Sequence, residues 1–398
     1  MTTDSSNHSD QSEMNDQKSK DAKPPESSAS SEKDDAIRLS LVPGVGPRTY
    51  QNLLDAFGDA ESVLRTGSSK LQRVQGVGAK LAQQIAEARE TIDIAELQKL
   101  CSDNRIEILS RADGAYPNLL KEIHDPPNIL FAQGSLLPED SLAIAIVGSR
   151  HATRYGTSVA ESLARALAMA GFTVVSGLAR GIDAAAHLGA LQAGGRTVAV
   201  LGSGLMNVYP SEHKKLAQEI VQQGAVLSES HPLHPPKSGA FPQRNRIVTG
   251  MCLGVIVVEA AQRSGALISA RLANEQGREV FAVPGQINSR MSRGCHALIR
   301  DGAKLIENVD DVLEELGPLA LPVRVGAADQ TTTVRHPGEL KLTEQESKIL
   351  NTIGVASTQI DDIIAQTGLP AQRVLSTVSV LEMRKLIRRL SGTTVSRI

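Results

Sequence analysis

The chain has 398 residues, of which 41% are hydrophobic and 22% charged, a composition that is ordinary for a globular protein of several domains. Its net charge of −2 excludes a basic surface over the whole molecule, and its 2% of aromatic residues, with no Trp, argue against a nucleic-acid site built mainly on aromatic stacking. Three cysteines without a CxxC spacing, no long apolar run and no signal peptide predict a cytoplasmic protein without disulfides, zinc or membrane contact.

Residues 1–35 consist largely of Ser, Asp, Lys, Gln and Pro and contain almost nothing to bury. Such a segment cannot offset the entropy that is lost on ordering, so we predict a disordered tail. Ordered structure is then expected from about residue 36.

Residues 36–90 contain an internal repeat, because "LVPGVGPRTYQNLLDAFG" (41–58) is followed by "RVQGVGAKLAQQIAEA" (73–88). Each copy places a GVG turn before an amphipathic helix. The turn glycines are Gly44, Gly46, Gly76 and Gly78. Free backbone N–H groups at such helix N-termini bind phosphate, so the repeat predicts a tandem helix–hairpin–helix-like module with accessory phosphate-binding turns. The alternative is a plain helical hairpin whose glycines serve only the turns.

Residues 91–141 are predicted to form a connecting segment, with one helix at about 92–104 and a Pro-rich stretch after it. From residue 142 the pattern changes to short β-branched runs that are separated by stretches of helical length. The runs are "LAIAIVG", "FTVVSG", "RTVAVLG", "AVLSE", "VIVVEA", "EVFAVPG" and "KLIEN". Continuous apolar strands with helices between them indicate a parallel sheet that is covered on both faces. We therefore predict an α/β, Rossmann-like doubly wound, mainly parallel domain over 142–316.

Residues 317–340 are rich in Pro, Gly, Thr and Ala and are predicted to form a linker. Residues 341–398 then give a capped helix, a second helix, a turn at Gly368–Pro370, a further helix and a β-type ending. This order predicts a winged-helix-like domain, a class that binds DNA or protein.

Small and basic residues follow most of the predicted strands, at the edge where sites of such sheets lie. The candidate ligands are Gly148, Ser149, Arg150, Ser176, Gly177, Arg180, Gly181, Gly202, Gly204, Lys237, Phe241, Arg244, Asn245, Arg246, Ser264 and Gly265. Glycine admits a close backbone approach, Ser donates hydrogen bonds and Arg binds phosphate oxygens in pairs. One small phosphate needs one or two strand ends, so a row of them predicts a polyanion-binding edge. Phe241 and Tyr155 are the candidates for base stacking.

The stretch "FPQRNRIVTG" (241–250) has two arginines and no acidic residue near them until Glu259. We predict that one arginine, preferably Arg244, contacts phosphate. Arg246 would then pair with a distant carboxylate such as Glu259 or Asp183.

Catalytic motifs are absent from the sequence. It has no GxGxxG after the first strand, no P-loop, no GxSxG and no metal-ligand spacing, so neither a cofactor nor an enzymatic activity is predicted. Asp183 and His187 lie one helical turn apart and form either an acid–base pair or a pair that holds a loop, and we favour the loop.

The chain from about 110 to 316 closely resembles the DNA processing protein A (DprA/Smf) family. The motifs that carry the resemblance are "IVGSR", "SGLARGIDAAAHLGAL", "VLGSGLMNVYP", "FPQRNRIVTG", "VVEAAQRSGALISARLA", "REVFAVPG" and "LIRDGA", in this order. Ser211 departs from the pattern, since many relatives have a basic residue there.

The resemblance implies a sequence-independent single-stranded DNA-binding protein. Such proteins protect incoming DNA and help load the recombinase RecA during natural transformation and DNA recombination, without an established catalytic activity. It also implies a homodimer through the Rossmann-like domain and phosphate contacts by Arg150, Lys237, Arg244 and Arg246. Duplex DNA is a further candidate partner of the terminal modules.

Two other classes stay open. A nucleotide-processing, phosphoribohydrolase-type enzyme shares the fold, but "VEAAQRSGALIS" lacks the double glycine of that class, and Glu259 is the one carboxylate that could serve it. A duplex-DNA repair scaffold would instead rely on the two terminal modules.

Overall fold

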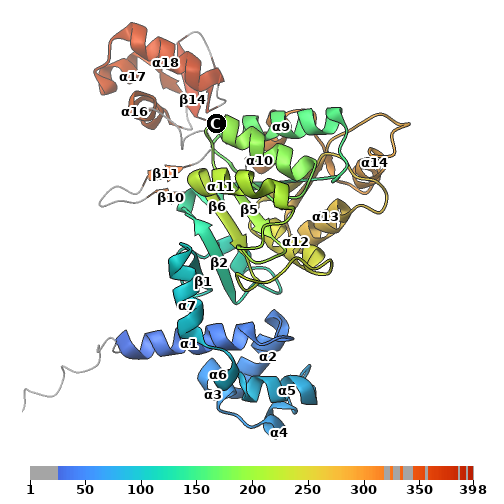
Figure 1. Cartoon of the computed structure of the whole chain (residues 1–398). Coiled ribbons are helices and arrows are strands. Elements are labelled where there is room, and N and C mark those ends of the chain that lie inside the picture. The colour runs from blue at the N-terminus through green and yellow to red at the C-terminus, as the bar shows by residue number, and fades with distance from the viewer. Residues whose placement is uncertain are drawn as a thin grey trace, which may run out of the picture.

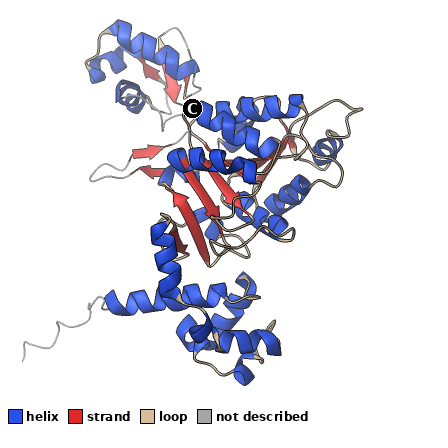
Figure 2. Ribbon diagram, viewed as in Figure 1, coloured by secondary structure: helices blue, strands red, loops and turns tan. Residues whose placement is uncertain are grey.

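The computed structural model describes residues 26–317, 323–325, 332–334, 344–354, 357–383, 386–390 and 393–397. A large sheet with helices on both faces forms the centre (Figure 1). A helical module lies at one end, and a small module of helices and short strands lies at the other (Figure 2).

The central sheet has nine strands in the order β1-β2-β6-β5-β4-β3-β7-β8-β9. They are β1 (Glu107–Ser110), β2 (Ile129–Gly134), β3 (Ala143–Val147), β4 (Thr173–Ser176), β5 (Thr197–Leu201), β6 (Gly224–Ser228), β7 (Gly254–Val257), β8 (Glu279–Ala282) and β9 (Lys304–Leu305). The strands from β3 to β9 pair in parallel and correspond to the seven predicted runs, so the predicted fold class is confirmed. The strands β1 and β2 were not predicted, and they extend one edge by antiparallel pairing.

Helices cover both faces of this sheet. They are α8 (Asn118–Lys121), α9 (Arg154–Met169), α10 (Ile182–Gln192), α11 (Lys214–Gln223), α12 (Ala240–Gly250), α13 (Gly265–Glu275), α14 (Arg293–Arg300) and α15 (Val309–Leu316). One face carries α9, α10 and α11, and the other carries α12 and α13. Because both faces are covered, the central strands are apolar throughout, as the continuous runs indicated.

The N-terminal module contains α1 (Glu26–Leu41), α2 (Pro47–Phe57), α3 (Ala60–Leu64), α4 (Ser68–Leu71), α5 (Ala79–Ala86) and α6 (Ala88–Thr91), and α7 (Ile94–Asp103) connects it to the sheet. The repeat is visible in the backbone, since Gly44 and Gly76 have φ of +98° and +87°. Gly46 and Gly78 then precede α2 and α5 without a side-chain cap. The helix N-termini of both copies are therefore open.

The predicted disordered tail is too long, because α1 already begins at Glu26, while residues 1–25 lie outside the described residues. Asp35 is buried and accepts hydrogen bonds from Arg38 and Arg89, each at 2.6 Å. Ile37 packs against the sheet and Leu39 packs into the N-terminal module. The polar, acidic composition of this segment therefore did not predict α1, a helix that packs against both the sheet and the N-terminal module.

The C-terminal module has the predicted winged-helix order. Its elements are α16 (Glu344–Thr352), β12 (Thr358–Gln359), α17 (Ile360–Thr367), α18 (Ala371–Met383), β13 (Ile387–Arg389) and β14 (Thr394–Arg397). Gly368 ends α17 with φ of +66°, as the predicted turn requires. The predicted linker is not without structure, because β10 (Val323–Val325) pairs with β11 (Thr332–Val334) inside it.

The contact between α9 and α10 depends on Gly189. A Cβ there would lie 2.2 Å from the Glu161 carbonyl oxygen of α9. We expect Gly189→Ala to lower the free energy of unfolding by about 1–3 kcal/mol, because α9 and α10 must separate. Denaturant unfolding would measure this. Gly265→Ala is the matched control, because a Cβ at Gly265, in helix α13 of the same domain, meets no atom within 4 Å. Equal stability of the two variants would contradict the packing argument.

Candidate nucleic-acid interface

The carboxyl ends of β3, β4 and β5 meet the start of α12 at a small pocket, here called the strand-end pocket. Its lining residues are Arg150, Gly177, Ala179, Arg180, Tyr209, Pro210, Phe241 and Arg244. Five of them are predicted ligands: Arg150, Gly177, Arg180, Phe241 and Arg244. Three guanidinium groups thus converge at the edge of the sheet where parallel strands end, which is the expected place for an anion.

Helix α12 places the buried side chain of Arg244 at the base of this pocket. The segment that carries Arg244 and Arg246 is helical, and Pro242 falls in its first turn, where the missing N–H is tolerated. The Arg244 residue is 6% exposed, and its Nη1 donates to the Val200 carbonyl. A Cβ on Gly177 would lie 2.3 Å from that Nη1. Only glycine therefore lets the turn after β4 pass over the guanidinium.

The buried carboxylate of Asp183 accompanies Arg244. Asp183 Oδ2 accepts from the backbone N–H groups of Gly177 at 3.2 Å and Ala179 at 3.4 Å. Burial raises the pKa of Asp183, and the charge of Arg244 opposes this rise. Burial lowers the pKa of Arg244 to about 10, so the guanidinium stays cationic at neutral pH. Its Nε has no hydrogen-bond partner among the described residues, which leaves it unused donor capacity.

Two aromatic rings and Arg150 form the exposed part of the pocket. The Arg150 Cζ lies 5.2 Å from the centre of the Phe241 ring, within cation–π range. The rings of Phe241 and Tyr209 are 5.5 Å apart, and Tyr209 is 40% exposed. Gly202 allows this arrangement, because a Cβ there would lie 2.8 Å from the Phe241 ring.

Arg180 is already paired within the chain. Its Nε and Nη2 contact the two carboxylate oxygens of Glu212 at 2.5 and 2.9 Å. About half of each side chain is exposed, so the pair is a weak one that a phosphate can replace.

Several predicted ligands at the strand ends have packing roles. A Cβ on Gly148 would lie 2.5 Å from α10, and Gly181, with φ of +75°, passes within contact of the Ser149 carbonyl. Ser149 Oγ accepts from a nearby backbone N–H, and Ser176 Oγ donates to a carbonyl of β3 at 2.6 Å. These residues shape the turns around the pocket without lining it.

Arg246 forms ion pairs with two carboxylates, Glu229 and Asp125, that were not predicted as its partners. Its Nη2 lies 2.7 Å from both oxygens of Glu229, and its Nε lies 3.1 Å from Asp125. The predicted pairing of Arg246 with Glu259 or Asp183 is therefore wrong. The side chain ties α12 to the end of β6 and the loop after α8, and it does not line the pocket.

The remaining predicted ligands lie outside the pocket lining. Gly204 packs against the His231 and Pro232 carbonyls, and Ser264 caps α13. Lys237 is exposed, while Asn245 is partly exposed on α12 and Gly265 begins α13. Of the predicted row of strand ends, only those of β3, β4 and β5 line the pocket. The predicted ligands outside the pocket stay predictions as DNA ligands.

Comparison with known proteins agrees with this geometry. The family model for DNA recombination-mediator protein A matches residues 107–317. The chain belongs to this family, DprA/Smf. Models of the DprA winged helix domain and of a SAM-like helix–hairpin–helix tandem match residues 334–393 and 36–91. These matches confirm the family resemblance and the character of both terminal modules.

Individual relatives extend the match to nearly the whole chain. Protein Smf from Synechocystis is 34% identical over 391 residues, which is 92% of this chain and 98% of the relative. DNA processing protein DprA from Streptococcus pneumoniae is 46% identical over 224 residues, covering 56% and 78% of the two chains. The X-ray structure of that Streptococcus pneumoniae protein superposes with a TM-score of 0.62 at 37% identity, covering 71% of this chain and 97% of the other.

In this DprA-family chain, three residues of the pocket lining were not predicted as ligands: Ala179, Tyr209 and Pro210. Tyr209 is the aromatic one. The sequence shows it only as an aromatic residue after a strand, beside Pro210. Its contact with Phe241 depends on the fold of two distant loops. The predicted stacking candidate Tyr155 instead lies across the sheet edge, where its hydroxyl donates to the Pro284 carbonyl at 2.9 Å.

The candidate acid–base groups are structural. Asp183 holds the turn after β4, as the favoured interpretation expects, whereas the fully buried His187 lies with its Nδ1 2.7 Å from Thr197 Oγ1 on strand β5 and holds no loop. Glu259 accepts from the Thr153 N–H and hydroxyl at 2.8 and 2.6 Å, which fixes the start of α9. The candidate carboxylate of a phosphoribohydrolase is thus engaged in the fold.

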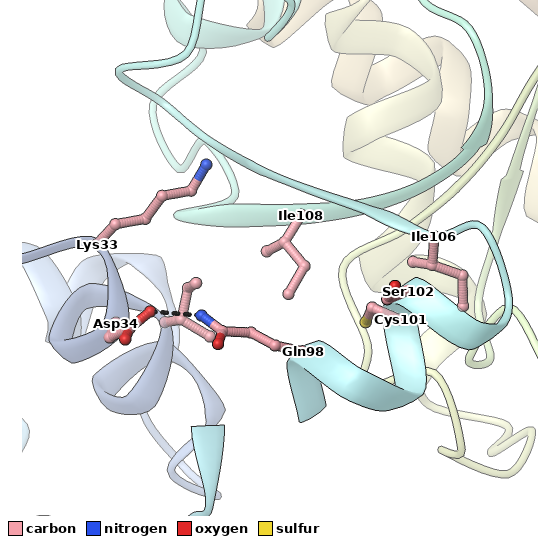
Figure 3. A pocket seen from close by; sticks show the side chains of 8 residues that line it. Lys33, Asp34, Gln98, Cys101, Ser102, Ile106 and Ile108 are labelled. Atoms are coloured by element: carbon pink, nitrogen blue, oxygen red, sulfur yellow. Dashed lines mark hydrogen bonds between the residues drawn. The ribbon is translucent and has the colours of Figure 1, made fainter. Parts of the chain in front are cut away.

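A second pocket lies between α1, α7 and β1 (Figure 3). Gln98 donates to Asp34 there at 2.7 Å, and burial raises the pKa of Cys101 to about 11, so its thiol is protonated at neutral pH. The part of the chain that the structure describes contains no group of three His, Cys, Asp or Glu residues placed to hold a metal. Within the same part, no helix is both long and apolar enough to cross a membrane.

The burial of His187 predicts a pH dependence of stability. Burial lowers the pKa of His187 to about 3, whereas an unfolded histidine titrates near 6.5. Below about pH 6.5 the unfolded state therefore gains a proton that the native state does not bind. The contribution of His187 to the free energy of unfolding is therefore fully present above about pH 6.5. It falls as the pH is lowered, by about 2 kcal/mol on reaching about pH 5. Denaturant unfolding of His187→Asn should lack this loss, and the exposed-site variant His124→Asn should keep it. Parallel profiles for all three proteins would contradict the assignment.

Proposed function

We propose that the chain binds single-stranded DNA through the phosphate backbone at the strand-end pocket. The observation that carries the proposal is the buried, cationic Arg244 under a glycine turn, with Arg150 exposed beside it. A buried cation with unused donor capacity favours an anion, and the family to which the chain belongs contains proteins named for DNA processing.

The chemistry of the pocket favours binding without sequence preference. Arginines and backbone turns contact phosphate and position a strand, whereas base identity is recognised by side chains at base edges. Tyr209 and Phe241 add aromatic surface on which any base can stack. Binding should therefore be strongly salt-dependent, because it releases counterions.

Membership of the DprA/Smf family supports a wider role. We propose that the chain protects incoming single-stranded DNA in the cytoplasm, helps load the recombinase RecA, and acts in natural transformation and recombination as a homodimer formed through its central domain. It acts by binding and not by catalysis. Glu259, the one carboxylate that could serve a phosphoribohydrolase, accepts two hydrogen bonds from Thr153. This supports a binding function over a phosphoribohydrolase activity.

A second contact, to duplex DNA, is favoured by the N-terminal repeat. Gly46 and Gly78 leave two helix N-termini open, and a Cβ at either glycine would meet no atom within 4 Å. Arg48 and Lys80 are exposed at equivalent positions of α2 and α5. Two such turns with a cation each match two phosphates of a duplex.

Removal of Arg150 tests the strand-end pocket. We expect Arg150→Ala to weaken binding of labelled oligo-dT by about fourfold near 0.15 M salt and to lower the salt slope by about 0.7, the loss of one phosphate contact. Fluorescence anisotropy of the full chain would measure both. Lys215→Ala removes the same charge from a side chain that is 88% exposed on α11 and should change neither. The same small effect from both variants would count against the pocket.

Removal of Arg48 and Lys80 tests the duplex contact. The double variant Arg48→Gln, Lys80→Gln should lower the salt slope of duplex binding by about 1.8 and leave oligo-dT binding unchanged. Arg65→Gln with Lys99→Gln is the control, since it removes equal charge from exposed positions at the end of α3 and on α7. If both double variants lower duplex affinity equally, the glycine turns are not the phosphate sites.

A further inference from the structure

Four arginines lie beyond the strand-end pocket, at the opposite half of the same sheet edge. They are Arg154 at the start of α9, Arg263 after β7, and Arg290 and Arg293 after β8. All four are exposed, and none has a carboxylate or hydrogen-bond partner for its side chain among the described residues. We call these four residues the arginine edge.

The arginine edge lies on three loops, and hydrogen bonds connect these loops to one another. The loop after β3 is joined to the loop after β7 by the Thr153–Glu259 bonds. The loop after β7 is joined to the loop after β8, because Ala260 N donates to the Met291 carbonyl at 2.8 Å and Gly294 N donates to the Ala260 carbonyl at 2.8 Å. The four cations are therefore presented by one connected surface.

Among the described residues, no carboxylate forms an ion pair with these four arginines, and the exposed Glu307 interacts electrostatically with Tyr155 beside them. Glu259 is the one carboxylate on the three loops, and it is 3% exposed and engaged with Thr153. Arg180 and Arg244 of the strand-end pocket, in contrast, each face a carboxylate of the chain, Glu212 and Asp183. A set of guanidiniums without ion pairs attracts a polyanion more strongly than a paired set.

Apolar side chains stand among these arginines. Tyr155 is 52% exposed, and its hydroxyl is fixed by the Pro284 carbonyl, which holds the ring between two of the loops. Ile287, on the loop after β8, is 89% exposed. A single strand presents phosphates and unstacked bases together, and cations beside an oriented aromatic ring suit both.

We infer that the arginine edge is a second segment of the single-strand path, which continues from the strand-end pocket across the end of β3. This inference rests on the proposed function. Neighbouring strands lie about 5 Å apart, so β7 and β8 extend the path by about 10 Å. The segment adds affinity only for oligonucleotides that are long enough to reach it.

Paired variants and two lengths of oligo-dT test this inference in the full chain. The variant Arg263→Gln, Arg290→Gln removes two cations of the arginine edge. It should weaken binding of an oligonucleotide of about 16 nucleotides by about tenfold near 0.15 M salt and lower its salt slope by about 1.4. Binding of an oligonucleotide of about 5 nucleotides should not change, because it is held by the strand-end pocket.

The matched control is Arg165→Gln with Arg271→Gln, which removes equal charge from exposed arginines of α9 and α13 that pair with Glu161 and Glu275. It should leave both lengths unaffected. If the Arg263 and Arg290 variant unfolds, Arg154→Gln with Arg293→Gln gives the same test on the same surface.

Three results would overturn the inference. The long oligonucleotide could bind as tightly to the arginine-edge variant as to the control. Both lengths could weaken equally, which would indicate a distorted pocket. The molecular mass in solution could change while DNA affinity does not, which would assign this surface to protein contact. Failure of Arg150→Ala to weaken the short oligonucleotide would instead contradict the proposed function itself, so the two failures are distinguishable.

Discussion

The strand-end pocket depends on two buried groups of opposite charge, Arg244 and Asp183, which interact electrostatically beneath the turn that follows β4. Neither charge would be stable alone in this position, since an unpaired buried ion costs several kcal/mol. Asp183 orders the turn through the N–H groups of Gly177 and Ala179, and Gly177 leaves room for the guanidinium. The two groups therefore fix the shape of the strand-end pocket and give it a permanent cation.

The same two groups support the proposal that the pocket binds a backbone phosphate. A cation that is desolvated by folding has already lost its water, so an entering anion does not have to displace it. Arg150 and Arg180 stand above it in more exposed positions and can follow a flexible strand. One buried cation with exposed cationic neighbours favours binding by phosphate position over recognition of a base.

Sequence patterns predicted the central domain well, because a sheet that is covered on both faces needs continuous apolar strands, and seven such runs are visible. The antiparallel strands β1 and β2 were missed, since they lie in a short Pro-rich segment whose pairing is decided by contact with β6. The strand-end chemistry indicated Arg150 and Arg244 correctly as neighbours. It could not show that α12 is helical, and for that reason it gave Arg246 the wrong partner, although Glu229 is near in sequence. Tyr209 was not predicted as a ligand for a similar reason. Its contact with Phe241 joins two segments that are distant in sequence and meet only in the folded chain.

The most direct test of the account is competition between a strand and a single nucleotide. Labelled oligo-dT would be titrated with the full chain, and thymidine monophosphate would be added while fluorescence anisotropy is followed at two salt concentrations. We predict a steep salt dependence and no displacement by the mononucleotide, because the affinity comes from several phosphates together. Displacement by a low concentration of thymidine monophosphate would contradict the account, since it would make the strand-end pocket a site for a small molecule.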